Sequence, residues 1–216
     1  MTFLYQTRAY TNNEKEAAAA AIVENAIPDR DFYLLVLGAA LFALFGIALD
    51  SMPVLIGAMI VAPLASPILA LGLGVVVSNG RLVVRSLYTL VAASLIAAIA
   101  VAVVAYFLPS FSINGTFISF ATHPLYDIAI ALIAGAIAAY GTMRAKVGGA
   151  MTGIGIAVSL MPPLVAASLA LGRFDLSLFR ESSFIFLFNV GGILVGSVVV
   201  LAAFGIGSHY RPAADQ

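Results

Sequence analysis

The residues with the most suggestive chemistry are prolines that interrupt two long apolar stretches. Pro63 and Pro67 lie in the first stretch, and Pro162 and Pro163 lie in the second. Proline has no amide hydrogen, so within a helix each one leaves the carbonyl one turn earlier without its hydrogen bond. Such carbonyls, together with nearby hydroxyl groups, can bind an ion or a small polar molecule. The pattern predicts a binding site and offers no catalytic group.

The oxygen atoms of this predicted site follow from helical geometry. The prolines would free the carbonyls of Met59 and Pro63 in one stretch, and of Val158 and Ser159 in the other. Ser66 and Ser159 add hydroxyl groups beside them. Free carbonyls that face lipid are unfavourable, so these must face protein or a wet cavity. The alternative is that the prolines only bend helices for packing, and the sequence favours neither interpretation.

Asn189 lies in the last apolar stretch and could complete the site. An amide in hydrocarbon needs hydrogen-bond partners, so its side chain should face the interior of a helix bundle. It could line a pathway or bind a carbonyl that a proline has freed. Hydrogen bonding between two helices is the simpler use.

The composition defines the environment of these residues. Of 216 residues, 62% are hydrophobic and 9% are charged, and the mean hydropathy is +1.10. A soluble domain is about 25% charged, and so few polar groups could not cover its surface. Lipid removes that difficulty. We therefore predict an all-α polytopic membrane helix bundle in contact with the lipid bilayer.

Net charge and cysteine usage exclude several classes of function. The net charge is zero and there is no basic run, so nucleic acid is not an expected partner. Cysteine is absent, which excludes disulfides and thiolate metal sites. Neither histidine has a companion at metal-binding spacing. We expect no cofactor and no metal.

Six apolar segments are candidates for transmembrane helices, since spanning takes about 20 residues. Residues 1–30 form a short cytoplasmic or interfacial segment, with a helix over 12–27 that begins at a Thr11–Glu14 capping box. Residues 31–208 form the transmembrane domain, and 209–216 form a tail. The candidate spans are 32–49, 53–78, 83–108, 124–142, 147–171 and 184–206.

Lysine and arginine predict the orientation. With six spans, eight basic residues fall on the side that holds both termini, and only Arg173 and Arg180 fall on the other. This positive-inside bias places both termini in the cytoplasm. The eight residues are Arg8, Lys15, Arg30, Arg81, Arg85, Arg144, Lys146 and Arg211.

The two halves of the domain show an internal repeat. A shift of 96 residues aligns Gly57 with Gly153 and Pro67 with Pro163, with five matches in 14 positions. Each half holds three spans, so the halves must face opposite ways across the membrane. The sequence predicts a 3+3 inverted repeat with proline-broken second and fifth helices. The halves are residues 31–108 and 124–206.

Three stretches resemble a known family. Residues 55–69 read LIGAMIVAPLASPIL, residues 155–164 read GIAVSLMPPL, and residues 186–189 read FLFN. Over roughly residues 30–206 the chain is similar to the domain of unknown function 389 family, also called the uncharacterised hydrophobic domain. The resemblance implies a membrane protein of a prokaryotic cell with no settled activity. With the repeat, it gives as candidate pathway residues Gly57, Pro63, Ser66, Pro67, Ser159, Pro162, Pro163 and Asn189.

Three functions compete for this pattern. The first is a transporter or channel for an unidentified small solute or ion. The second is a non-transporting scaffold or anchor for a partner protein or lipid, favoured by the lack of buried charge. Small-residue motifs such as Gly192-xxx-Gly196 could serve packing within the chain or between copies, and we expect a homo-oligomer. A membrane enzyme is not expected, because no nucleophile, base and acid set is present.

Overall fold

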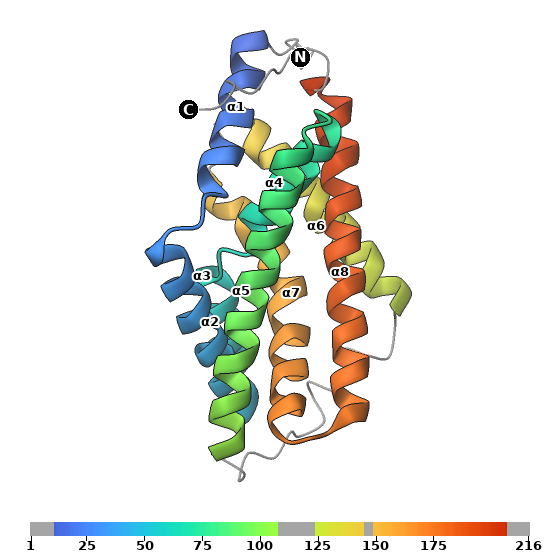
Figure 1. Cartoon of the computed structure of the whole chain (residues 1–216). Coiled ribbons are helices and arrows are strands. Elements are labelled where there is room, and N and C mark those ends of the chain that lie inside the picture. The colour runs from blue at the N-terminus through green and yellow to red at the C-terminus, as the bar shows by residue number, and fades with distance from the viewer. Residues whose placement is uncertain (1–10, 108–123, 145–148, 207–216) are drawn as a thin grey trace.

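The chain folds as a bundle of α-helices (Figure 1). The computed structural model describes residues 11–107, 124–144 and 149–206, without the side chains of 124–125, 149–155 and 157–158. Within these ranges there are eight helices and no strand. They are α1 Asn12–Asn25, α2 Arg30–Ala48, α3 Met52–Val61, α4 Ala65–Val76, α5 Gly80–Phe107, α6 Pro124–Met143, α7 Gly149–Gly172 and α8 Leu176–Ala203.

Helix α1 begins at the predicted capping box. The backbone N–H of Thr11 donates to the Glu14 carboxylate at 2.9 Å, and the N–H of Glu14 donates to the Thr11 hydroxyl at 3.4 Å. Ala18, Ala19 and Ile22 are buried, and α1 packs against α4 and α6. The N-terminal helix is therefore docked on the bundle along one face, at the end where α8 finishes (Figure 1).

Short polar side chains begin three of the longer helices. Asp29 accepts from the N–H of Phe32, Asn79 from that of Leu82, and Asp175 from that of Leu178. Each satisfies an amide that has no partner within its helix. Because Asp175 caps α8, the helix begins at Leu176. The connection between the predicted spans 147–171 and 184–206 is therefore shorter than expected.

The long helices have the length and surface of membrane spans. Helices α2, α5, α6 and α8 are long and apolar enough to cross a bilayer, and the bent pair α3–α4 would give a fifth span. The fully described stretch of α7, Ser159–Gly172, is apolar but shorter than a membrane span. On α5, large apolar side chains such as Leu87, Leu95 and Ile99 are exposed. The chain is an all-α membrane protein, with four or five of the six predicted spans accounted for.

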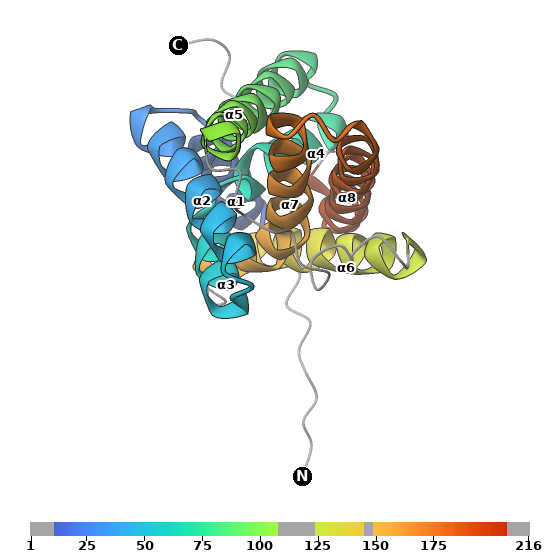
Figure 2. The same cartoon turned by 90° about the horizontal axis from the view of Figure 1, so that it is seen from below.

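Helix α7 forms the centre of the bundle. It contacts α2, α3, α4, α5, α6 and α8, and the end-on view shows these helices around it (Figure 2). The three sequence stretches that carry the predicted site are therefore grouped around α7.

Small residues let α6 and α8 approach closely. A Cβ atom added to Gly135 would overlap the backbone of Ile193, and one added to Gly196 would overlap that of Leu132. One added to Gly192 would lie 2.8 Å from the Ala131 methyl group. The Gly192-xxx-Gly196 motif thus serves packing within the chain. The sequence holds a second motif of this type, Gly149-xxx-Gly153, whose side chains lie outside the described residues.

Candidate functional site

The second predicted span is broken at Pro63. Helix α3 ends at Val61, α4 begins at Ala65, and the two are bent by 48°. Ala62 has φ −69° and ψ 119°, the extended conformation that a following proline imposes on the preceding residue. The carbonyl of Pro63 accepts from the N–H of Ser66 at 3.3 Å, which starts the next helix. The prediction of a broken helix here is confirmed.

Only one of the two prolines makes this break. Pro67 lies in the first turn of α4, where its missing N–H would have no helical partner in any case. Ser66 is half-buried beside it. Gly57 lies away from the break, on α3, where an added Cβ would be 3.0 Å from the Phe42 ring of α2. Gly57 therefore serves the contact between α2 and α3 in this structure.

The predicted break in the fifth helix is wrong. Helix α7 runs without interruption from Gly149 to Gly172, with Pro162 and Pro163 inside it and both buried. The side-chain amide of Asn189 on α8 donates to the carbonyl of Ser159 at 2.7 Å. This is the carbonyl that Pro163, four residues later, leaves without a helical partner. The neighbouring helix thus replaces a missing hydrogen bond, and α7 keeps its helical form.

Two polar atoms at this contact remain unsatisfied. The Ser159 hydroxyl oxygen and the Asn189 carbonyl oxygen are buried and have no hydrogen-bond partner among the described residues. The two residues are 8% and 5% exposed. A buried polar group without a partner is unfavourable by about 1–3 kcal/mol, and such groups are rare unless water, an ion or a ligand binds there. The Ser159–Asn189 contact, which we call the polar contact, is the strongest candidate site.

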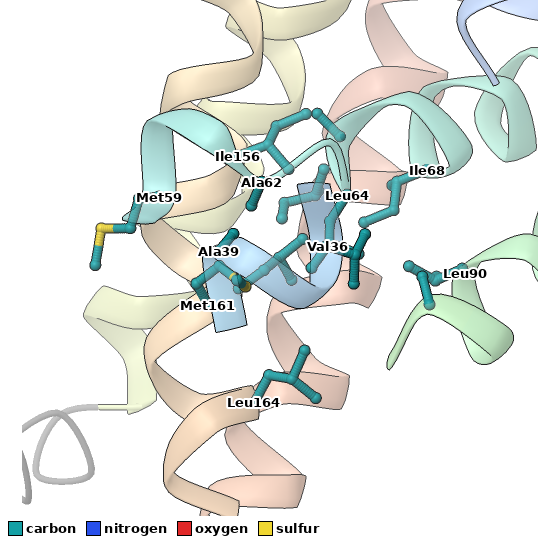
Figure 3. Packing of buried hydrophobic residues seen from close by; sticks show 14 of the residues in the cluster. Val36, Ala39, Met59, Ala62, Leu64, Ile68, Leu90, Ile156, Met161 and Leu164 are labelled. Carbon is teal, nitrogen blue, oxygen red and sulfur yellow. The ribbon is translucent and has the colours of Figure 1, made fainter. Parts of the chain in front are cut away.

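The surroundings of the polar contact are apolar. Ala62 and Leu64 at the break belong to one buried cluster with Ile156 and Met161 of α7. Figure 3 shows this cluster between the break, α7 and Val36 of α2. The α3–α4 break thus packs on the proline-containing part of α7 through hydrocarbon side chains. Sequence reasoning missed these packing residues, since apolar residues carry no signal in a chain that is mostly apolar.

The comparison with known proteins agrees with the resemblance seen in the sequence. A family model described as a domain of unknown function (DUF389) matches residues 59–195. The chain belongs to this family. The DUF389 match includes the break at Pro63, the prolines of α7 and Asn189.

One curated relative of this DUF389 chain is an uncharacterized protein of Methanocaldococcus jannaschii. It is 31% identical over 178 residues, which cover 82% of this chain and 55% of the relative. The chain therefore spans about half the length of the curated relative that it matches. No solved structure matches the chain.

Replacing Pro63 with alanine should straighten the α3–α4 pair. The new N–H could donate to the Met59 carbonyl, and the preceding residue would no longer be driven to an extended conformation. Since the chain has no cysteine, spin labels on Ile56→Cys and Val75→Cys would report a longer distance in the Pro63→Ala variant. Pro53→Ala is the matched control, because Pro53 lies at the start of α3, where proline fits a helix. An unchanged distance in Pro63→Ala would show that packing alone imposes the bend.

Proposed function

We propose that the protein is a multi-pass transporter or channel for a small solute or ion. The observation that carries this proposal is the polar contact, where two buried oxygen atoms lack partners among the described residues of an apolar bundle. A protein that needed only stable packing would gain by replacing them with hydrocarbon. All the groups there are neutral, which favours an uncharged solute or an ion bound by hydroxyl and carbonyl oxygens.

The arrangement of the helices supports an inverted repeat in this proposal. The first half would comprise α2, the α3–α4 pair and α5, and the second half α6, α7 and α8. Within each half, the first and second segments are in contact, as are the second and third and the first and third. The proposal includes six spans in a prokaryotic cell membrane, with both termini in the cytoplasm.

The two halves differ at their central helices, and this difference suggests a transport cycle. The α3–α4 pair is broken, whereas α7 is continuous and held by the Asn189 hydrogen bond. In the proposed cycle, α7 opens at Pro162–Pro163 when Asn189 releases the Ser159 carbonyl. Broken helices at matching positions of two inverted halves are a common basis for alternating access around a central site.

The direct test is flux through purified protein in sealed liposomes. Wild-type protein should move at least one member of a panel of monovalent ions, anions and small neutral solutes, measured against empty liposomes. A panel in which every member gives the same flux with and without protein would contradict the transport proposal.

A second candidate function is a non-transporting scaffold or anchor for a partner protein or lipid. It is favoured by the apolar packing around the break, where Leu64, Ile156 and Met161 are all fully buried. A homo-oligomer is part of either proposal.

Water access to the polar contact separates the two functions. The transport proposal predicts that Ser159→Cys reacts with a water-soluble thiol reagent in liposomes, since that position would line the pathway. Ser168→Cys is the control, because Ser168 is buried and its hydroxyl binds the Leu164 carbonyl of its own helix. Absence of reaction at Ser159→Cys from both sides of the membrane would favour the scaffold.

A further inference from the structure

A groove lies on the surface of the bundle between α5, α7 and α8. It encloses about 150 Å³. Ser94, Leu164 and Phe186 line one end of it, and Leu171 and Phe179 line the other. From Leu164 to Leu171 is two turns of α7, so the groove is about 10 Å long. It is separate from the polar contact, and no step of the proposed transport cycle uses it.

The walls of this groove present hydrocarbon. The Ser94 hydroxyl donates to the Leu90 carbonyl at 2.8 Å, and the Ser168 hydroxyl donates to the Leu164 carbonyl at 2.6 Å. Both hydroxyls are thus occupied by their own helices, and the surface of the groove is almost entirely apolar. Ser183 also lines the groove, but almost none of the lining surface is polar. A polar solute would therefore gain few hydrogen bonds here, whereas a hydrocarbon chain would lose no solvation on entering.

The groove opens onto the surface that faces lipid. Leu95 on α5 and Leu171 on α7 both line it and are 56% and 48% exposed in the bundle. In a membrane these side chains contact acyl chains. A lipid chain could therefore enter sideways, without passing through the bundle.

Aromatic rings gather at the Leu171 end of the groove. The ring centroid of Tyr106 lies 5.3 Å from that of Phe107 and 6.5 Å from that of Phe174. Phe174 is 83% exposed and has φ +60°, a conformation that is unfavourable for a bulky residue. Tyr106 is itself exposed, and tyrosine is enriched at the level of the lipid headgroups. This end of the groove therefore marks a membrane–water interface.

Cationic groups lie at the same end. Arg180 follows the groove residue Phe179 and is exposed. The Nε and Nη2 atoms of Arg173 are buried without a partner among the described residues. Asp175 accepts from the N–H of Leu178 and Glu181 accepts from the Ser177 hydroxyl, so the two acids balance the charge of the two arginines without binding them in these contacts. The guanidinium groups therefore offer hydrogen-bond donors to a phosphate group.

We propose that the groove between α5, α7 and α8 binds one acyl chain of an anionic phospholipid, with its phosphate beside Arg180. The lipid belongs to the leaflet at the Phe174 end of the bundle. Apolar walls, an opening to lipid, aromatic rings at headgroup level and an exposed guanidinium together match the two parts of such a molecule. A bound lipid would fill the space between α7 and its neighbours, next to the helix that the proposed cycle bends.

A tryptophan probe can test this directly, because the chain contains no tryptophan. Phe179→Trp places the probe at the end of the groove, and Phe188→Trp places a control on the exposed, lipid-facing surface of α8. Both proteins are reconstituted in phosphatidylcholine that contains a small fraction of phosphatidylglycerol with brominated acyl chains, which quench tryptophan fluorescence.

At Phe179→Trp, quenching should correspond to roughly fivefold enrichment of the brominated anionic lipid over its bulk fraction. One arginine contributes about 1 kcal/mol to the free energy of binding an anionic lipid. At Phe188→Trp, quenching should follow the bulk lipid fraction. Equal quenching at both positions would overturn the proposal.

Two further variants locate the acyl chain and the phosphate. In the Phe179→Trp background, Ala98→Phe fills the groove and should abolish the enrichment. Arg180→Gln should remove the preference for the anionic lipid and leave quenching at the bulk fraction. Enrichment that survives both changes would overturn the proposal. So would a loss of dimers in Ala98→Phe with no change in quenching, because the groove would then be an interface between two copies of the chain.

Discussion

Replacing Gly196 with alanine should destabilise the bundle by about 1–3 kcal/mol or more, although it adds a single methyl group. The new Cβ would overlap the backbone carbonyl of Leu132 on α6. A flexible side chain could move aside, but a helix backbone can only be displaced as a whole. Helices α6 and α8 would therefore separate, and close packing of this kind is a main source of helix association in lipid. The measurement is the free energy of unfolding of the protein in micelles.

Gly191 provides the matched control for this change. It lies on the same helix, and an added Cβ there meets no atom of the described residues within 4 Å. Gly191→Ala should stabilise the protein by about 0.5–1 kcal/mol, because alanine loses less conformational freedom in a helix than glycine. If the two variants shifted stability by the same amount, the close approach of α6 to α8 would not be a source of stability.

Much of the fold could be predicted from the sequence because strong local rules determine it. Apolar runs of sufficient length predicted the helices, and the Thr11–Glu14 pair predicted the start of α1. Pro63 predicted the bend between α3 and α4, since proline acts on its own backbone and on the preceding residue. The start of α8 was predicted too late, because the polar residues Arg180 and Glu181 were taken for a connection although Asp175 caps a helix before them.

The outcome at Pro162 and Pro163 depended on a residue far away in the sequence. Proline removes a hydrogen bond from its own helix, but whether the helix then breaks depends on what another helix supplies. Asn189 lies 30 residues from Ser159, and only the fold brings its amide to the freed carbonyl. The same limit applies to the lipid groove, since its apolar residues are distinguished from others only by the space that they enclose.

The hydrogen bond from Asn189 should be worth about 1–2 kcal/mol of stability. Its loss should lower the flux, because the proposed cycle needs α7 to return to its closed, hydrogen-bonded form. Asn189→Leu keeps the number and branching of the side-chain heavy atoms but leaves the Ser159 carbonyl buried without its donor, which is unfavourable in a low-dielectric interior. Ser197→Ala is the control on the same helix, because the Ser197 hydroxyl is buried but binds the Leu194 carbonyl of its own helix. That change should affect stability and flux little.

A double-mutant cycle with Pro163→Ala distinguishes this interpretation from simple loss of packing. Alanine at position 163 restores a backbone N–H that can donate to the Ser159 carbonyl, so Asn189 is no longer needed there. Asn189→Leu should then be about 1 kcal/mol less destabilising than in the wild type, a coupling within the range for groups in direct contact. Additive effects would show that the amide does not replace the missing helical bond. If flux falls in Pro163→Ala while stability rises, the proline is retained because α7 must open, and the hydrogen bond that Asn189 makes is the one that opening breaks.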